Sequence, residues 1–452
     1  MINKQPRNYY STLLTSLPWQ ALIEYAKESS TPQFKAKLAR ILACLDTAIS
    51  KQLSYVVQHH HFKALEASWK GLKSLAELPF SHRRIKVKLL DSNWNEVAKD
   101  LNHHYEIKQS ALYKKLYCEE LDTAGGTPFG VVLIDHNIAS DYRENESYDD
   151  LYTLQLLSEL GEVALCPMVL GVDECFFGDV QRRQLHDNSR IERILDSDDF
   201  QSWQLLRQKS SARFLHLVLP EHLLRQPYHQ YVAGFEFKEQ QNHCNALWGN
   251  SAYLLISNII REFERISWFG FLRAYDKHDG HGAIVRQSES VCAKVDLFSE
   301  DDGFWAEQGF VPLTSLYLSD HKGFFSNQSV WKTEESSRQL GMLQTNLMAC
   351  RFGHYIKAQI RDQIGRYDSA DECKRSLERW LQHYVSDVDY GEDSIMARYP
   401  LKACQIRITT SDRDRTHYLC EIMLQPQYQY EIVDAQVVLT TVLPASELEK
   451  RE

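Results

Sequence analysis

The sequence predicts a mixed α/β and α+β protein: a largely parallel sheet with flanking helices, plus a smaller C-terminal α+β domain. Two observations lead to this fold class. Strand-like runs alternate with helical runs through most of the chain, which is typical of βαβ units and a parallel sheet. Near the C-terminus, helical runs are instead followed by strand-like runs, which is typical of an α+β domain. The chain has 452 residues, more than one core usually organises, so we expect two or three domains.

Helical periodicity dominates the N-terminal part. Residues 13–30 have the amphipathic pattern of a short helix, which Thr31 and Pro32 interrupt. In residues 46–78 apolar side chains recur at helical spacing. We expect a helix pair there whose apolar stripes face the core, the first made of Ile49, Leu53, Val56 and His60 and the second of Phe62, Leu65, Trp69, Leu72 and Ala76.

The predicted parallel sheet rests on the next part of the chain. Residues 130–135 are apolar on both faces, as expected of a central parallel strand. Residues 85–92 alternate as a strand, with Ile85, Val87 and Leu89 on one face. The other elements are expected, in chain order, as a helix at 93–121, a helix at 149–161, a strand at 162–171, a helix around Trp203 and a strand at 213–220.

The C-terminal half begins with a strongly periodic helix at 250–266. The span 276–345 is rich in Gly, Ser and Asp and is expected to form loops and short strands. The remaining elements are expected as a strand at 268–274, helices at 353–364 and 371–385, and strands at 401–410, 417–426 and 436–444.

Composition favours a soluble cytoplasmic protein. The net charge of −10 argues against a protein that mainly binds nucleic acid, which needs a basic surface. No run is apolar and long enough to span a bilayer, and the N-terminus lacks the pattern of a signal peptide. The ten cysteines form no Cys-x-x-Cys pair and are expected to be free thiols.

The stretch TAGGTPFGVVLIDH (residues 123–136) resembles a phosphate-binding loop only superficially. Such a loop follows a strand and opens a helix, whereas here a helix precedes the glycines and a strand follows them. We therefore expect a tight turn that leads into a strand. Asp135 is expected at the end of that strand, where sites often form in parallel sheets, although capping the next turn is the favoured role.

Other candidate chemistry is weak. The histidines at 59–61 point in different directions on a helix, with His60 toward the core. The His-Asp-Gly-His run at 278–281 lacks the further ligands of a closed metal site and is expected to be a polar turn. No Gly-x-Ser-x-Gly, His-Glu-x-x-His or P-loop motif occurs. We therefore predict no enzyme, no cofactor and no metal.

A β-branched run near the C-terminus is the strongest candidate for a contact between subunits. It lies at QVVLTTVLP (residues 436–444), and neither of its faces is strongly polar. Such a strand can pair within its own sheet or extend the sheet of a neighbouring subunit. Without other information, pairing within the chain is favoured.

Several blocks together resemble the large sheath subunit of type VI secretion systems, the TssC, VipB or EvpB family. They occur in family order over about residues 45–445: HFKALEASWKGLKSL (61–75), AGGTPFGVVLIDH (124–136), WQLLRQKSSARFLHLVLPEHLLRQPY (203–228), LWGNSAYLLISNIIREF (247–263), EQGFVPL (307–313), FFSNQSV (324–330), RFGHYIKAQIRDQIG (351–365) and ARYPLKACQIRI (397–408). Their number and order carry the resemblance.

The resemblance implies a contractile tail-sheath-like fold and a structural function. A member of this family pairs with a TssB-like small subunit and polymerises with other copies around an Hcp tube on a cytoplasmic baseplate. It then contracts to propel the tube and is recycled by a ClpV-type unfoldase, without nucleic acid and without insertion in a membrane. By position, the strand that links subunits would comprise Val437, Val438, Leu439, Thr440, Thr441 and Val442, and the unfoldase-recognition helix would include Leu13, Leu14, Leu17, Trp19, Leu22 and Ile23.

The predicted organisation is an N-terminal arm at 1–44, an N-terminal sheath region at 45–345 and a C-terminal sheath domain with the linking strand at 346–452. Two alternatives stay open. One is a baseplate or adaptor component that uses the same fold without polymerising. The other, less favoured, is a nucleotide-dependent α/β enzyme with its site near Asp135.

Overall fold

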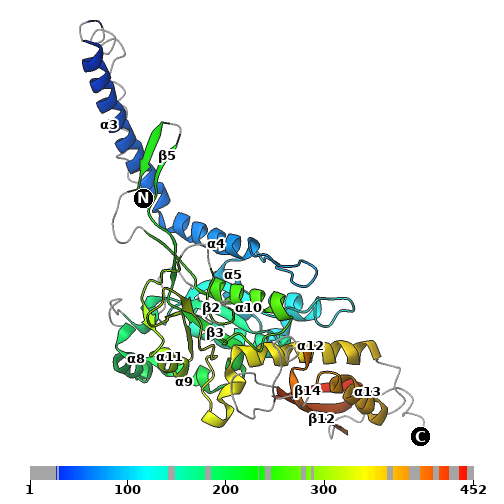
Figure 1. Ribbon diagram of the computed structural model, residues 1–452. Helices are drawn as coiled ribbons and strands as arrows, with labels where there is room; N and C mark the ends of the chain where they lie inside the picture. The colour runs from blue at the N-terminus through cyan, green and yellow to red at the C-terminus, as the bar shows by residue number, and fades with distance from the viewer. Residues whose placement is uncertain are drawn as a thin grey trace. The chain divides into compact units, whose positions relative to one another are not determined.

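The computed structural model of the chain (Figure 1) forms two compact units. The smaller unit comprises residues 1–66 and 225–247, and the larger unit comprises residues 67–224 and 248–452. The structure describes residue 27 and residues 30–140, 148–178, 185–232, 234–239, 246–275, 281–286, 290–363, 370–385, 398–410, 417–426 and 437–444.

The smaller unit is built on the long helix α3 (Thr31–Val57) and the hairpin of β5 (His229–Val232) and β6 (Phe235–Lys238). The two strands are antiparallel, and Figure 1 shows the hairpin beside α3. Ser50 joins them: its hydroxyl donates to the carbonyl of Glu236 at 3.1 Å and accepts from the N–H of Lys238 at 3.3 Å. Ser50 therefore attaches α3 to the hairpin.

The helix pair predicted at 46–78 is confirmed as α3 and α4 (His60–Ala76), with a break after Val57, although α3 begins earlier, at Thr31. The prediction that the first apolar stripe faces the core is wrong, because Ile49, Leu53 and Val56 are 43%, 39% and 57% exposed. His60 is also exposed, and repulsion by His61 lowers its pKa. The periodicity identified an apolar face correctly, but it could not say whether the rest of the chain buries that face.

The larger unit contains the predicted parallel sheet, which confirms the fold class. Its strand order is β1 (Val132–Ile138), β2 (Met168–Val172), β3 (Leu215–Leu219) and β9 (Phe310–Pro312), and every pair is parallel. β1 was predicted to be central, but among the described strands it lies at the edge. Apolar residues on both faces of a strand indicate that other elements pack above and below the sheet. They do not indicate that a strand pairs with each of its two edges.

Apolar clusters cover both faces of this sheet. One contains α7 (Asp150–Ala164), α9 (Gln201–Gln208) and a group of interlocking aromatic rings. In that group the rings of Trp203 and Phe310 stack at 5.3 Å, and Phe177 meets Trp305 edge to face at 5.5 Å. The other cluster contains α10 (Ala252–Ile266) and α12 (Leu343–Gln363). The predicted helices around 149–161, Trp203 and 250–266 are thus confirmed.

Three predicted elements are wrong. Residues 85–92 form no strand. The helix expected at 93–121 breaks into α5 (Trp94–His103), η1 (Ile107–Gln109), α6 (Ala111–Tyr113) and the π-helical η2 (Lys114–Cys118). The strand expected at 268–274 is a series of turns that starts after Ser267, whose left-handed φ of 60° ends α10, and buries its aromatic side chains without a ladder.

The C-terminal elements match the prediction closely. β12 (Leu401–Thr410), β13 (His417–Pro426) and β14 (Val437–Pro444) form an antiparallel meander with β13 in the middle. α13 (Ala370–Gln382) packs on β12, and α12 lies alongside the same sheet (Figure 1). α12 begins ten residues before the predicted start at 353. Its first turns bury Leu343 and Leu347 at helical spacing, but the polar run Gln344, Thr345 and Asn346 between them, which is also buried, hides that pattern in the sequence.

The remaining elements are short. They are η3 (Glu174–Phe177), α8 (Asn188–Leu195), η5 (Asp198–Phe200), η6 (Ser210–Phe214), β4 (His222–Arg225), β7 (Leu247–Gly249), β8 (Leu297–Phe298), α11 (Asp302–Glu307), β10 (Thr314–Ser315), β11 (Lys322–Gly323) and η7 (Glu335–Gly341). β4 pairs with β7, and β10 lies between β11 and β8.

Candidate subunit interfaces

The strand predicted to link subunits forms β14. It pairs with β13 of the same chain, in a register that places Thr441 opposite Cys420 and Leu439 opposite Ile422. The six predicted residues, Val437, Val438, Leu439, Thr440, Thr441 and Val442, all lie in this strand. In the described part of the chain no further strand pairs with β14, so one row of its backbone groups stays available. A role in a neighbouring subunit remains a prediction.

The predicted unfoldase-recognition helix cannot be placed in this structure. Its residues, Leu13, Leu14, Leu17, Trp19, Leu22 and Ile23, lie outside the described residues. Of the His-Asp-Gly-His run at 278–281, only His281 is described.

The turn before β1 agrees with the sequence prediction. Gly125 has φ of +82°, which L-residues adopt rarely, and the N–H of Gly126 donates to the carbonyl of Thr123 at 3.1 Å. Asp135 lies within β1 and not at its end, so neither the strand-end site nor the turn cap predicted for it is found. Among the described residues, no group of three or more His, Cys, Asp or Glu side chains is arranged to hold a metal ion.

The exposed face of α3 is apolar along most of the helix. Its large apolar side chains are spaced three or four residues apart and therefore form one stripe along the helix. Their exposed fractions are 37% for Leu38, 53% for Leu42, 41% for Leu45, 43% for Ile49, 39% for Leu53 and 57% for Val56. Contiguous exposed apolar surfaces of this kind mark sites of protein association.

The helix α4 continues this character. Phe62, Leu65 and Trp69 are 41%, 57% and 61% exposed on successive turns. Its other side is closely packed: a Cβ at Gly71 would lie 2.5 Å from the ring of Tyr253. The predicted second stripe is thus also largely uncovered.

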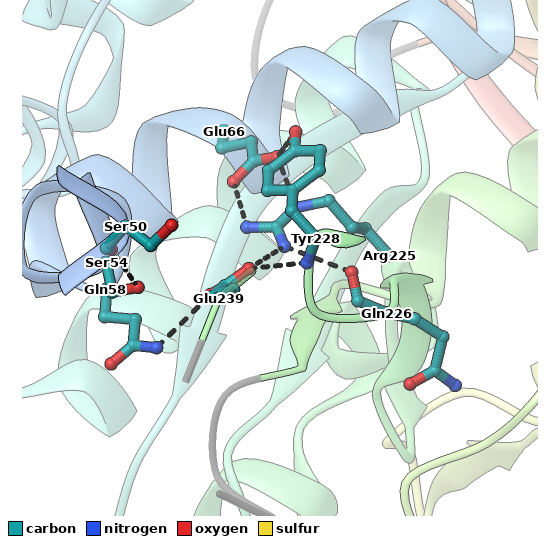
Figure 2. A network of polar contacts seen from close by, with 8 residues as sticks. All are labelled: Ser50, Ser54, Gln58, Glu66, Arg225, Gln226, Tyr228 and Glu239. Atoms are coloured by element: carbon teal, nitrogen blue, oxygen red, sulfur yellow. Dashed lines mark hydrogen bonds and ion pairs between the residues drawn. The ribbon is translucent and has the colours of Figure 1, made fainter. Parts of the chain in front are cut away.

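A buried ionic network around Arg225 holds the smaller unit together (Figure 2). The guanidinium of Arg225 binds Glu66 with both arms, from Nε to Oε1 at 2.7 Å and from Nη2 to Oε2 at 2.9 Å. Its Nη1 donates to Oε2 of Glu239 at 2.9 Å and to the carbonyl of Gln226 at 3.1 Å. Parallel N–H···O bonds between a guanidinium and a carboxylate are roughly twice as strong as hydrogen bonds between neutral groups.

Tyr228 and Gln58 complete the network. The N–H of Tyr228 donates to Oε2 of Glu239 at 2.8 Å, its hydroxyl donates to Oε1 of Glu66 at 3.1 Å, and its ring centroid lies 3.9 Å from the guanidinium. Gln58 Nε2 donates to Oε1 of Glu239 at 3.4 Å. Burial and then the charge of Glu66 raise the pKa of Tyr228. Burial alone would lower the pKa of Arg225, but the bonds and charges of Glu66 and Glu239 outweigh it and raise that pKa.

The network connects chain segments that are far apart in sequence. Glu66 lies in α4, Arg225 ends β4, Glu239 follows β6, and Gln58 follows α3. The side chains of Arg225, Glu66 and Glu239 are 6%, 12% and 0% exposed. The network thus fixes the junction of α3 and α4 against the base of the hairpin. The sequence contains Arg225 and Tyr228 in the block LLRQPY, but it gives no sign of a partner 159 residues away.

Three buried histidines make the larger unit sensitive to acid. Burial lowers the pKa of His216 to about 3 and those of His222 and His354 to about 4. In the unfolded chain each pKa is about 6.5, so the unfolded chain binds more protons than the folded chain between pH 6.5 and 4. The contribution of these histidines to stability is therefore complete above pH 6.5 and falls below it, by up to about 1.4 kcal/mol per pH unit for each histidine.

We expect the urea midpoint of unfolding to fall between pH 7 and pH 5. The variant His354→Gln should show a shallower fall, because glutamine cannot titrate but keeps a donor for the carbonyl of Ala164, which Nε2 of His354 contacts at 3.3 Å. An unchanged pH dependence in this variant would exclude His354 as a source of the effect.

Comparison with known proteins identifies the family. The model of the EvpB/VC_A0108 tail sheath N-terminal domain matches residues 39–331, and that of the family's gpW/gp25-like tail sheath domain matches residues 332–443. The chain belongs to the EvpB/VC_A0108 tail sheath family. It is therefore a structural subunit of a contractile sheath, and membership of this family implies assembly with other sheath subunits. This confirms the resemblance seen in the sequence.

A curated relative agrees with the sheath family. The type VI secretion system sheath protein TssC1 of Pseudomonas aeruginosa is 26% identical over 432 residues, which cover 90% of this chain and 86% of that protein. Among the described residues of this sheath subunit, no helix is long and apolar enough to cross a membrane.

Two solved sheath structures were also matched. The sheath tail protein of Desulfitobacterium hafniense aligns with a TM-score of 0.32 and 8% identity. The aligned part covers 66% of this chain and 62% of that protein. The sheath of the extracellular contractile injection system PVC, in its contracted state, aligns with a TM-score of 0.35 and 8% identity over 70% of this chain and 68% of that one.

Proposed function

We propose that this chain is the large subunit of a type VI secretion sheath. It pairs with a TssB-like small subunit, polymerises with other copies around an Hcp tube on a cytoplasmic baseplate, and contracts to propel the tube. The observation that carries the proposal is the exposed apolar stripe of α3. A stripe at helical spacing is suited to burial against a helix of another subunit, and the small subunit is the partner proposed for it.

The charge of α3 defines the partner surface further. The helix contains four cations (Lys35, Lys37, Arg40 and Lys51) and one carboxylate (Asp46), a net charge of 4 − 1 = +3 in a chain of net charge −10. A complementary helix would therefore carry an apolar stripe with acidic side chains beside it, because opposite charges steer association and fix its register.

The strand β14 supplies the second proposed contact. Its open edge can pair with a strand of a neighbouring subunit, through residues 437–442, and such backbone links keep subunits connected while they rotate. Contraction is then a collective repacking of subunit interfaces between two arrangements. In this proposal the predicted division into an arm (1–44), an N-terminal sheath region (45–345) and a C-terminal sheath domain (346–452) separates recycling, core assembly and linkage.

The recycling step is assigned to the N-terminal arm. Residues 13–23, including Leu13, Leu14, Leu17, Trp19, Leu22 and Ile23, are the proposed recognition site for a ClpV-type unfoldase. Their amphipathic pattern supports this assignment.

Co-expression of the chain with its small subunit tests the proposed function. Electron microscopy is expected to show hollow helical cylinders, and deletion of residues 437–444 is expected to abolish them while the two subunits still bind each other. A stable lone monomer with no affinity for the small subunit would contradict the proposal. Binding of the two subunits without any cylinders, even for the full chain, would instead support a non-polymerising adaptor. Cylinders that survive the deletion would contradict the proposed link through β14.

A further inference from the structure

The hairpin of β10 and β11 carries two large apolar side chains in its turn. Tyr317 and Leu318 lie between the two strands and are 76% and 90% exposed. Leu318 also has a left-handed φ of 57°, which is unfavourable for leucine because its Cβ approaches the backbone. A strained residue that buries almost none of its side chain gains nothing within the single chain. Such outliers concentrate at sites where a protein binds or switches.

The turn is nevertheless well ordered by its own hydrogen bonds. The N–H of Leu316 donates to the carbonyl of His321 at 3.1 Å, and the N–H of Ser319 donates to the carbonyl of Leu316 at 3.3 Å. The N–H of His321 donates to the hydroxyl of Ser319 at 3.2 Å. At the base of the hairpin, the buried side chain of Lys322 pairs with Asp296. The two apolar side chains are therefore presented from a positioned backbone, which reduces the entropy lost on binding.

The surroundings of the turn are acidic. β8 lies parallel to β10, with Phe298 opposite Ser315, and Phe298 is itself 50% exposed. The segments 295–302 and 313–323 together contain five carboxylates and one cation, Lys322, a net charge of 1 − 5 = −4. Three of these carboxylates are exposed, namely Asp296, Glu300 and Asp320. The turn is therefore an apolar projection in an acidic surface, and its complement is an apolar surface bordered by Lys or Arg side chains.

A second copy of this chain is the partner that fits these requirements. A polymer of identical copies needs two different surfaces that fit each other, and membership of the sheath family implies such assembly. The small subunit is proposed to face α3 with acidic side chains, and a surface of that charge would repel the acidic turn. In contrast, α12 has three cations and one carboxylate, a net charge of 3 − 1 = +2. It also exposes Tyr355 by 40%, with the guanidinium of Arg351 at 5.2 Å from the ring centroid.

We infer that Tyr317 and Leu318 dock on a basic, apolar surface of a second copy of this chain within the sheath. This inference rests on the proposed polymerisation. Docking removes the two apolar side chains from water, and that burial offsets the strained backbone of Leu318. The carboxylates around the turn steer the approach of the two copies and make their association sensitive to salt.

The variant Leu318→Asn separates strain from docking. Asparagine is polar and adopts a left-handed φ more readily than leucine. The variant should therefore melt at the parent's temperature or above it. With the small subunit present, the concentration needed to form cylinders should rise about tenfold or more. Tyr105→Asn is the control, because Tyr105 is 98% exposed and lies outside the acidic segments, and it should assemble like the parent. An equal loss of assembly in both variants would contradict the inference.

A photo-crosslinker at position 317 identifies the partner. The variant Tyr317→p-benzoylphenylalanine, irradiated in intact cylinders, should give a covalent product of two copies of this chain. A product with the small subunit or with the tube instead, or no product at all, would overturn the inference. The charge of the turn is tested by Asp320→Lys, which should raise the concentration needed for assembly, and by Asp320→Glu, which should not. Equal assembly of these two variants would contradict the charge complementarity.

The outcomes separate this inference from the proposed function. If the parent chain and its small subunit form cylinders, and Leu318→Asn forms them at the same concentration, the docking of the turn is wrong and the polymerisation stands. If the parent forms no cylinders, both proposals fall, because no second copy is then brought to the turn.

Discussion

The variant Arg225→Met is expected to lower the free energy of unfolding of the smaller unit by about 3–5 kcal/mol, because it leaves two buried carboxylates without their cation. Glu66 and Glu239 have side chains that are only 12% and 0% exposed. Neither can return to water unless the structure opens. Tyr228 and Gln58 would remain as neutral donors, which cannot replace a charge.

The measurement is urea unfolding together with hydrogen exchange. The amides of 50–66 and 228–239 should exchange faster in Arg225→Met, because the network joins the end of α3 and the start of α4 to the hairpin base. The larger unit should keep its protection.

Two control variants show whether the loss of stability comes from the buried charges. Lys73→Met breaks the exposed pair with Glu77, in which both side chains are more than 60% exposed, and should cost at most about 1 kcal/mol. The triple variant Arg225→Met, Glu66→Gln, Glu239→Gln removes all three charges and should recover part of the lost stability. An Arg225→Met variant as stable as Lys73→Met would show that the network contributes little.

The ionic network around Arg225 is a feature that the sequence could not predict. Arg225 lies in a motif that the sequence made conspicuous, yet its partner Glu66 is 159 residues away. Local periodicity carries no information about such a pairing. The same limit does not apply to α10 or to the strands β12, β13 and β14. A strong helical period in α10, and runs of strand-forming residues in the three strands, define each of these elements from its own sequence.

Two of the failed predictions share a physical cause. The apolar stripe of α3 and the strand pattern of 85–90 were both real, but within the described chain no element covers the first or pairs with the second. A hydrophobic pattern states that a face needs cover, whereas the covering partner can belong to another chain. The prediction that β1 is a central strand failed for a related reason. Apolar residues on both faces of a strand do not show whether a neighbouring strand pairs with each edge.

The double variant Leu42→Asp, Ile49→Asp is expected to abolish binding of the small subunit. Both side chains lie in the middle of the exposed stripe, where they are 53% and 43% exposed. Central apolar side chains of an interface contribute about 2 kcal/mol or more each, roughly 30-fold in Kd. Burying a carboxylate there adds a further penalty. Titration of the purified subunits, followed by calorimetry or light scattering, measures the loss.

A matched control distinguishes lost contact from a damaged helix. Cys44 lies on the same helix, is exposed and does not belong to the stripe. Cys44→Asp therefore places an aspartate in the same helix away from the proposed interface, with half of the charge that the double variant adds. It should bind the small subunit like the parent. Both variants should keep the parent's melting temperature, because the stripe is exposed in the lone chain and its substitution removes no buried contact. Equal loss of binding in both variants would mean that helix charge, and not the apolar stripe, governs association. The role of the stripe is therefore tested by the difference in Kd for the small subunit between two variants of the same helix. This comparison does not depend on the absolute affinity of the two subunits.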